Sequence, residues 1–193
     1  NTTAAMTGLN AATTVNILGG NSLSSFANGA TGVIAANTAA TTIDASGFLG
    51  NVTLNSATAG LNSFLTVKGG ALTTDTMTAP INGTVGTADK VASMTGIETL
   101  TITNAATDAT TNVTDLTNVT GLVTLAPTLS AGAGLISVSG IADGVNVKVS
   151  SATTADQVVL ALTNAAGTAN SLNVEMTATG AVGTHTLDLD VAG

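Results

Sequence analysis

The chain has 193 residues, 11 acidic against 3 basic residues, a formal net charge of −8, and only 2% aromatic residues. Such an acidic surplus repels a phosphate backbone, so the composition argues against nucleic acid as a partner and favours divalent cations. The longest apolar stretches, such as 158–162, are too short to span a bilayer, and the lack of cysteine excludes disulfides and thiolate metal sites.

The first 40 residues are less regular than the rest of the chain. Leu23, Phe26 and Ala30 are spaced at helix-like intervals. This spacing indicates a possible short helix near 21–31, although the glycines, threonines and asparagines of this stretch disfavour helix.

From about residue 41 onward, short strand signals recur at nearly regular intervals. In VNVKVS, 145–150, valines alternate with polar residues, which is typical of a strand with one buried and one solvated face. The expected strands are 42–45, 52–54, 64–68, 99–103, 122–125, 135–138, 145–149, 158–162, 172–176 and 184–191.

Two all-β architectures fit this pattern. An elongated parallel β-solenoid, resembling a β-helix or β-roll, would stack the strands with Val, Leu and Ile inside and Thr or Asn outside. A tandem β-sandwich would show the same alternation, but it usually anchors its core with Trp or Tyr, and this chain has neither. The sequence therefore favours the solenoid.

No linker rich in proline or charge divides the chain. We therefore expect an irregular N-terminal segment, 1–40, followed by one β-rich domain, 41–193, with a possible seam near 78–92. Pro80 and Pro127 are the only prolines, and we expect them at turn or edge positions.

Three segments resemble the RTX-related surface-layer proteins and large secreted adhesins of Gram-negative bacteria. They are TIDAS at Thr42–Ser46, LTVKGG at Leu65–Gly70 and DKVASMTGIETL at Asp89–Leu100, and the likeness loosely covers 40–190. The resemblance implies a calcium-dependent protein, exported by type I secretion, that self-assembles at the cell surface and has a β-rich body.

The chain departs from the calcium turn of that family, G-G-x-G-x-D-x-U. After Gly69 and Gly70, the remaining glycine position of the motif is occupied by Leu72, and Asp75 comes one residue late. We therefore expect a decayed or merely similar turn at this place. The segment 185–193 does not resemble a complete C-terminal export signal, so we expect the chain to be a fragment of a longer protein.

Calcium requires several converging oxygen ligands, which acidic turns can supply. For any one aspartate, stabilisation of its own turn is the stronger interpretation, but for the whole set we expect at least one bound calcium ion. Asp188 and Asp190 could share a cation on one face of the last strand, or they could simply keep an edge strand from pairing. The candidate ligands are Asp44, Asp75, Asp89, Asp108, Asp115, Asp143, Asp156, Asp188 and Asp190.

Catalysis is not expected. His185 is the only histidine, so a serine or threonine nucleophile has no obvious base, and sugar-cleaving clefts normally contain the Trp and Tyr that are missing here. Glu98 shares a face with Leu100 and Ile102. This carboxylate either lies just outside the strand, or it is paired with Lys90 or a cation.

The sequence thus predicts a non-enzymatic structural protein, secreted to the bacterial cell surface. It would self-assemble into a surface layer or fibre stabilised by calcium, with copies of itself and cell-surface polysaccharide as partners. The alternative is a repeat or binding module of a large secreted adhesin, and a phage or other extracellular fibre of similar composition is a third reading.

Overall fold

The computed structural model describes residues 3–4, 13–27, 41–56, 60–104, 111–129, 135–151, 157–163, 170–178 and 186–190. Throughout this part of the chain the fold is an all-β parallel β-solenoid, with a single short 3-10 turn at Leu61–Ser63 and no α-helix. Every ladder between the labelled strands is parallel, which confirms the solenoid and excludes the tandem sandwich.

The strands form three parallel sheets, and the chain returns repeatedly to the largest of them. The eight-stranded sheet contains, in order, β1 (Thr3–Ala4), β3 (Ser25–Ala27), β5 (Asn51–Asn55), β7 (Thr76–Pro80), β9 (Thr99–Thr103), β12 (Thr124–Leu129), β14 (Asn146–Ser151) and β16 (Asn173–Ala178). The five-stranded sheet contains β11 (Val119–Thr120), β8 (Met94–Thr95), β6 (Phe64–Lys68), β4 (Thr41–Phe48) and β2 (Thr14–Gly19). The four-stranded sheet contains β10 (Thr111–Asp115), β13 (Leu135–Ile141), β15 (Gln157–Leu162) and β17 (Thr186–Asp190).

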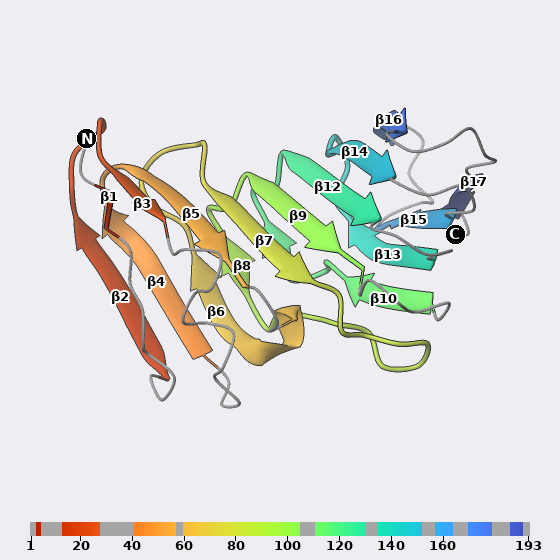
Figure 1. Cartoon of the computed structure of the whole chain (residues 1–193), viewed down its shortest axis with the longest axis horizontal. Helices are drawn as coiled ribbons and strands as arrows, with labels where there is room; N and C mark the ends of the chain where they lie inside the picture. Colours follow the sequence, from red (N-terminus) through yellow and green to blue (C-terminus); the bar gives the residue numbers. More distant parts are fainter. Residues whose placement is uncertain are drawn as a thin grey trace.

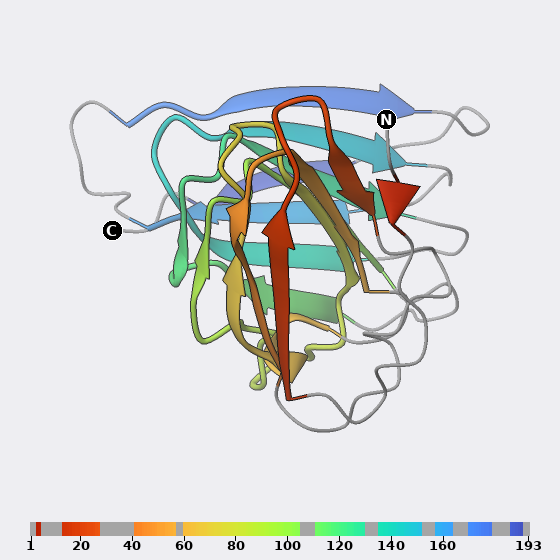
Figure 2. The same cartoon turned by 90° about the vertical axis from the view of Figure 1, so that its left-hand side faces the viewer.

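One circuit of the chain around the solenoid is called a rung below. Successive rungs lie side by side along the long axis, with β1 and β2 at one end and β16 and β17 at the other (Figure 1). The strand direction rotates steadily from the first rungs to the last, as the end-on view shows (Figure 2), which is the ordinary twist of a β-sheet.

The core runs along the axis as one continuous hydrophobic cluster. In β9, Leu100 and Ile102 are buried while the alternating Thr99, Thr101 and Thr103 face outward. Leu100 pairs in register with Met77 of the preceding rung and Leu125 of the following one. Since each buried side chain of this size stabilises the fold by about 1.5–3 kcal/mol, the rungs are held together mainly by these apolar stacks.

The outer face of the eight-stranded sheet has threonine in equivalent positions of consecutive rungs. Thr53, Thr76, Thr99 and Thr124 are direct register partners, and Thr76 Oγ1 donates a hydrogen bond to Thr53 Oγ1 at 3.3 Å. Because β-branched side chains fit a pleated surface, these ladders favour strand while keeping the face uncharged over β5, β7, β9 and β12.

The helix expected near 21–31 is wrong for the described residues, 21–27. They form a turn, in which Asn21 Oδ1 accepts a hydrogen bond from the Leu23 backbone N–H at 2.9 Å, followed by strand β3. Phe26 is buried there, whereas Leu23 is exposed. Because the Asn21 side chain accepts the hydrogen bond of the Leu23 N–H, this segment forms a turn instead of a helix.

The expectation that both prolines lie at turns or edges is also wrong. Pro80 ends β7 and Pro127 lies within β12, and both strands have a partner on each side. Pairing of β12 with β14 passes from Leu125 directly to Thr128. This gap covers Ala126 and Pro127, and Pro127 has no N–H to donate to the neighbouring strand.

The remaining expectations concern where the strands and the N-terminal segment begin and end. Strands 64–68 and 99–103 agree with β6 and β9, and the final expected strand, 184–191, contains β17 with its outer residues outside the described part. Strands β2 and β3 fall within 1–40 and pair with β4 and β5, so sheet pairing continues across residue 40.

Candidate functional site: carboxylates at the corners of the rungs

The described aspartates of the central rungs occupy two kinds of environment. Asp75 and Asp89, here called the inner carboxylates, are fully buried. Asp44 and Asp115, here called the outer carboxylates, lie partly exposed at the surface, each beside a lysine. The partners of each pair define what these groups can do.

Asp75 is an inner carboxylate placed directly before β7. Its Oδ1 accepts a hydrogen bond from the Val52 backbone N–H at 2.7 Å, and its Oδ2 accepts one from the Gly70 N–H at 2.5 Å. Burial raises the pKa of Asp75 above its ordinary value, while the two backbone hydrogen bonds act in the opposite direction. The side chain therefore links its own turn to the preceding rung.

The Gly69-Gly70 turn exists because two backbones meet there. A Cβ at Gly69 would lie 1.5 Å from the carbonyl oxygen of Gly96 and 2.9 Å from Asp75 Oδ2. Only glycine permits this approach. The turn that resembles a calcium loop is thus closed by Asp75 accepting hydrogen bonds from backbone N–H groups.

Asp89 is the second inner carboxylate and has the same kind of partners. Its Oδ1 accepts a hydrogen bond from the Asn62 N–H at 2.6 Å, and its Oδ2 accepts one from the Asn82 N–H at 3.1 Å. The Asp89 carbonyl accepts the Thr114 hydroxyl at 2.8 Å. A Cβ at Gly60 would lie 2.3 Å from Asp89 Oδ2, so another close-packed glycine flanks this carboxylate.

Glu98 lies immediately before β9 and extends the Asp75 corner into the next rung. Its Oε2 accepts a hydrogen bond from the Asp75 N–H at 2.9 Å, and the Glu98 N–H donates to the Asp75 carbonyl at 3.0 Å. The first of the two readings of Glu98 is confirmed, because this residue lies just outside the strand. Lys90 pairs with Asp115 instead.

Asp44 is an outer carboxylate within β4. It accepts hydrogen bonds from the Ser46 N–H at 3.0 Å and the Ser46 hydroxyl at 2.5 Å, and its Oδ2 lies 2.8 Å from Lys68 Nζ. The Lys68 ammonium and the Ser46 donors lower the pKa of Asp44 from 3.8 to about 2. Asp44 and Lys68 are register partners in neighbouring rungs.

Asp115 repeats this arrangement at the end of β10. It accepts hydrogen bonds from the Thr117 N–H at 2.9 Å and the Thr117 hydroxyl at 2.5 Å, and its Oδ2 lies 2.8 Å from Lys90 Nζ. Burial raises the pKa of Asp115, but the hydrogen bonds from Lys90 and Thr117 together outweigh it, and the net pKa is lowered.

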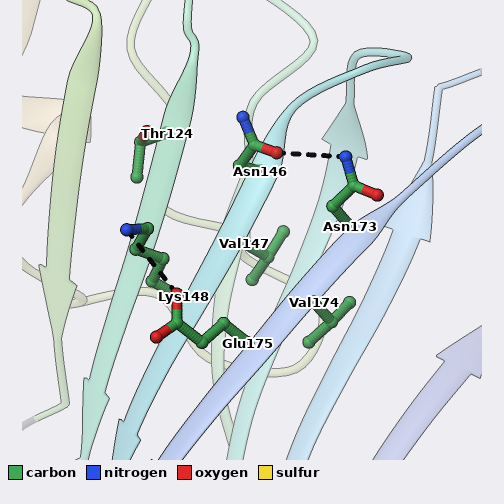
Figure 3. A pocket seen from close by; sticks show the side chains of 7 residues that line it. All are labelled: Thr124, Asn146, Val147, Lys148, Asn173, Val174 and Glu175. Atoms are coloured by element: carbon green, nitrogen blue, oxygen red, sulfur yellow. Dashed lines mark hydrogen bonds and ion pairs between the residues drawn. The ribbon is translucent and has the colours of Figure 1, made fainter.

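A third cross-rung pair lies on the outer face of the eight-stranded sheet. Lys148 Nζ is 3.6 Å from Glu175 Oε2, and beside it Asn173 Nδ2 donates to Asn146 Oδ1 at 3.1 Å (Figure 3). These side chains, with Thr124, line a shallow hollow of about 380 Å³ over β12, β14 and β16. The hollow combines amide, hydroxyl, ammonium and carboxylate groups with the apolar side chains of Val147 and Val174.

All three basic residues of the chain are lysines, and each of them pairs with an acid of a neighbouring rung. The partners Ser46, Thr117, Lys68 and Lys148 were missed by sequence reasoning. Two signals were available for them: the D-x-[ST] spacing at both outer carboxylates, and the scarcity of basic residues.

The other expected ligands are dispersed. Asp143 is exposed at a turn, where its Oδ1 accepts the Ser171 N–H at 2.6 Å, Asp188 is exposed on β17, and Asp190 ends the same strand. Asp108, Asp156 and His185 fall outside the described residues. Among the residues that are described, no three His, Cys, Asp or Glu side chains come together as a metal cluster.

Within the same described ranges, no helix is long and apolar enough to cross a membrane. Comparison with known proteins adds no relative, since no family model, curated protein or solved structure matches this chain.

Proposed function

We propose that the chain is a structural module of a protein secreted to the bacterial cell surface, where copies assemble into a surface layer or fibre with calcium as the counter-ion. The observation that supports this proposal is the way in which charged side chains are distributed. Every lysine is paired between rungs of the solenoid, while the chain keeps a formal charge of −8.

The distribution of side chains supports assembly in a physical sense. Over β7, β9 and β12, the outer face of the eight-stranded sheet consists mainly of threonines in register, which allow another surface to approach this part without desolvating charges. The unpaired acidic surplus keeps copies apart until a cation neutralises it. A calcium-rich medium would then favour association.

The residues that could contact calcium follow from the partners already described. Both oxygens of each inner carboxylate accept N–H donors, and each outer carboxylate has a lysine. The exposed carboxylates Asp143 and Asp188 keep access to solvent. We therefore propose Asp143 and Asp188 as ligands of a cation shared between copies, with Asp108 and Asp156 as further candidate ligands.

The test is assembly and stability with and without calcium. Purified protein is dialysed against EDTA and then given CaCl₂, with MgCl₂ and NaCl of equal ionic strength as controls. Calorimetry, thermal melting and electron microscopy follow each sample. We expect heat of binding, a higher Tm and ordered arrays with calcium alone. Absence of all three, at any protein concentration tested, would contradict the proposal.

A binding module of a large adhesin is the second candidate, and the hollow beside Lys148 and Glu175, with its mixed polar and apolar lining, favours it. Amide, hydroxyl and charged groups at one place can hydrogen-bond the hydroxyls of a cell-surface polysaccharide. Protein that remains monomeric in calcium but binds cells, and that loses binding in Asn173→Ala, would support the adhesin over the assembly module.

A further inference from the structure

We propose that Asn82 is a site of spontaneous covalent modification, where the side-chain amide is converted through a cyclic imide to isoaspartate and aspartate. The isoaspartate form then weakens the corner built around the inner carboxylate Asp89. The reaction needs only water, so this inference does not depend on the proposed assembly and goes beyond it.

The asparagines of this chain differ in the residue that follows them. The reaction starts when the backbone nitrogen of the next residue attacks the side-chain carbonyl carbon, so a branched side chain on that residue hinders it. Asn82 precedes Gly83, which has no side chain. Asn28 also precedes a glycine, but it falls outside the described residues. Strand asparagines that precede Val or Ile are Asn16, Asn51, Asn112, Asn146 and Asn173.

Asn82 lies between β7 and β8, at the base of a short hairpin in the loop that passes beside β10 (Figure 1). Thr84 and Thr87 exchange both backbone hydrogen bonds at 2.9 Å and so close the hairpin. Asn82 is exposed, and residues 84–87 are exposed as well, with Val85 at 76%. The reacting side chain is therefore accessible to water.

Few interactions hold the base of this hairpin against β10. The Gly83 carbonyl accepts the Val113 N–H at 3.1 Å, and Asp89 forms an isolated bridge with Thr114 instead of a continuous ladder. Segments with exposed side chains and few backbone hydrogen bonds open locally at a low cost in free energy. Gly83 itself is buried in the closed state, so this opening is the step that frees its nitrogen to react.

The overall reaction is a hydrolysis, without oxidant or reductant. The Gly83 nitrogen forms a bond to Asn82 Cγ, and the side-chain nitrogen leaves as ammonia with the proton that the Gly83 nitrogen gives up. Water then opens the ring. Cleavage of the new bond gives aspartate. Cleavage of the original peptide bond gives isoaspartate, in which the main chain runs through Cγ and is one carbon longer.

The longer main chain does not fit the closed corner. A Cβ on Gly83 would lie 2.1 Å from the Val113 carbonyl oxygen and 2.2 Å from the Asp89 backbone nitrogen, so no space is left around this residue. Asp89 Oδ2 accepts the Asn82 N–H at 3.1 Å on one side of the inserted carbon, and Gly83 accepts the Val113 N–H on the other. The isoaspartyl chain cannot keep both hydrogen bonds, and the corner loses stability.

Peptide mapping separates Asn82 from every other asparagine. Lys68, Lys90 and Lys148 are the only basic cleavage points, so a lysine-specific protease releases 69–90, in which Asn82 is the sole asparagine. The purified protein is kept at neutral pH and physiological temperature for several weeks and then digested at mildly acidic pH. A growing share of this peptide should gain the mass difference between a hydroxyl and an amino group, and electron-transfer fragmentation should identify isoaspartate in it.

Three controls accompany this measurement. Asn82→Gln should lose the modification, because its longer side chain disfavours ring closure. Asn118 is exposed but precedes Val119, so this site in the peptide 91–148 should stay unmodified over the same time. Asn82→Asp adds the charge without the extra carbon. In thermal melting, the isoaspartyl protein, separated by anion exchange, should have a lower Tm than Asn82→Asp, which should stay close to the parent protein.

Each part of the proposal has its own contrary result. If 69–90 stays unmodified, or is modified no faster than the Asn118 site, the proposed site is wrong. If isoaspartate forms but the isoaspartyl protein melts at the same temperature as the parent protein, the proposed effect on the Asp89 corner is wrong. Assembly in calcium is measured separately, and its failure would leave this inference in place.

Discussion

The inner and outer carboxylates use the same side chain in opposite ways. Asp75 is buried, accepts two backbone N–H groups and has a raised pKa, whereas Asp44 is partly exposed, faces Lys68 and has a lowered pKa. A buried donor left without a partner costs about 1–3 kcal/mol, but an exposed ion pair contributes only about 0.2–1 kcal/mol. The inner carboxylates therefore define the corners of the rungs, and the outer ones only reinforce them.

The largest effect on stability is expected at Gly69, where the turn beside Asp75 leaves no space for a side chain. Gly69→Ala places a methyl group against the Gly96 carbonyl and should lower the free energy of unfolding by about 3 kcal/mol or more. Gly144→Ala is the control, because Gly144 has a φ of 77° but nothing within 4 Å, so that change should cost about 1–2 kcal/mol through backbone strain. Urea unfolding of both variants gives the comparison. Equal losses would mean that the close approach at Gly69 is not essential.

Removing an inner carboxylate should cost more than removing an outer one. Asp75→Ala leaves the N–H groups of Val52 and Gly70 unpaired and should destabilise the protein by about 2–5 kcal/mol. Asp75→Asn retains an acceptor and should lose less. Asp44→Ala, the matched outer variant, should lose about 1 kcal/mol or less in the same urea titration. The reverse order would break the distinction between the two environments.

The two environments should also respond oppositely to pH. The folded-state pKa of Asp44 lies below its ordinary value, so its stabilisation is present above pH 3.8 and is lost as the pH falls from about 4 to about 2. The pKa of Asp75 is raised, so its contribution is full below pH 3.8 and is lost as the pH rises through the folded-state value.

Urea unfolding from pH 2 to 7 tests this difference with Asp44→Asn and Asp75→Asn. The stability gap between the parent protein and Asp44→Asn should narrow below pH 4, whereas the Asp75→Asn gap should change in the other direction. Parallel pH curves for the two variants would show that the environments do not differ electrostatically.

The smallest effect is expected at the most exposed ion pair. Lys148 and Glu175 are 59% and 65% exposed and lie 3.6 Å apart, so Lys148→Ala should change the unfolding free energy by less than about 0.5 kcal/mol. Lys90→Ala removes contacts with both Asp115 and Thr117 and should cost more, up to about 1 kcal/mol. Thermal melting of both variants and the parent protein in low and high salt tests this ranking, since salt screens the ion pairs and should reduce the difference in Tm between each variant and the parent protein. An equal loss in both variants would contradict this ranking.

Features that depend on residues close together in the sequence were easier to predict than contacts between rungs. Strands β6 and β9 were predictable because Val, Leu and Ile alternate with polar residues. The local hydrogen bonds at Asp44 and Asp115 were predictable because each carboxylate accepts from the backbone N–H two residues later. The burial of Asp75 was not predictable, because its partner Val52 is 23 residues away and becomes a neighbour only once the rung length is known. The position of Pro127 was predicted wrongly for the same reason. A strand tolerates a proline where the neighbouring strand does not need a hydrogen bond from that residue's N–H, and this depends on which strands become neighbours.

The rung-by-rung hydrogen bonds have a consequence for how the chain reaches its fold. Side-chain hydrogen bonds between rungs join residues only about one circuit apart, with separations from 23 to 28. Each rung therefore stabilises only its immediate neighbours, as in a one-dimensional lattice of coupled units. Ordering can begin at any well-packed pair of rungs and spread outward, and unfolding can begin at either end without the interior melting first. A chain built this way can acquire structure progressively as it emerges from a narrow channel, before its far end is present.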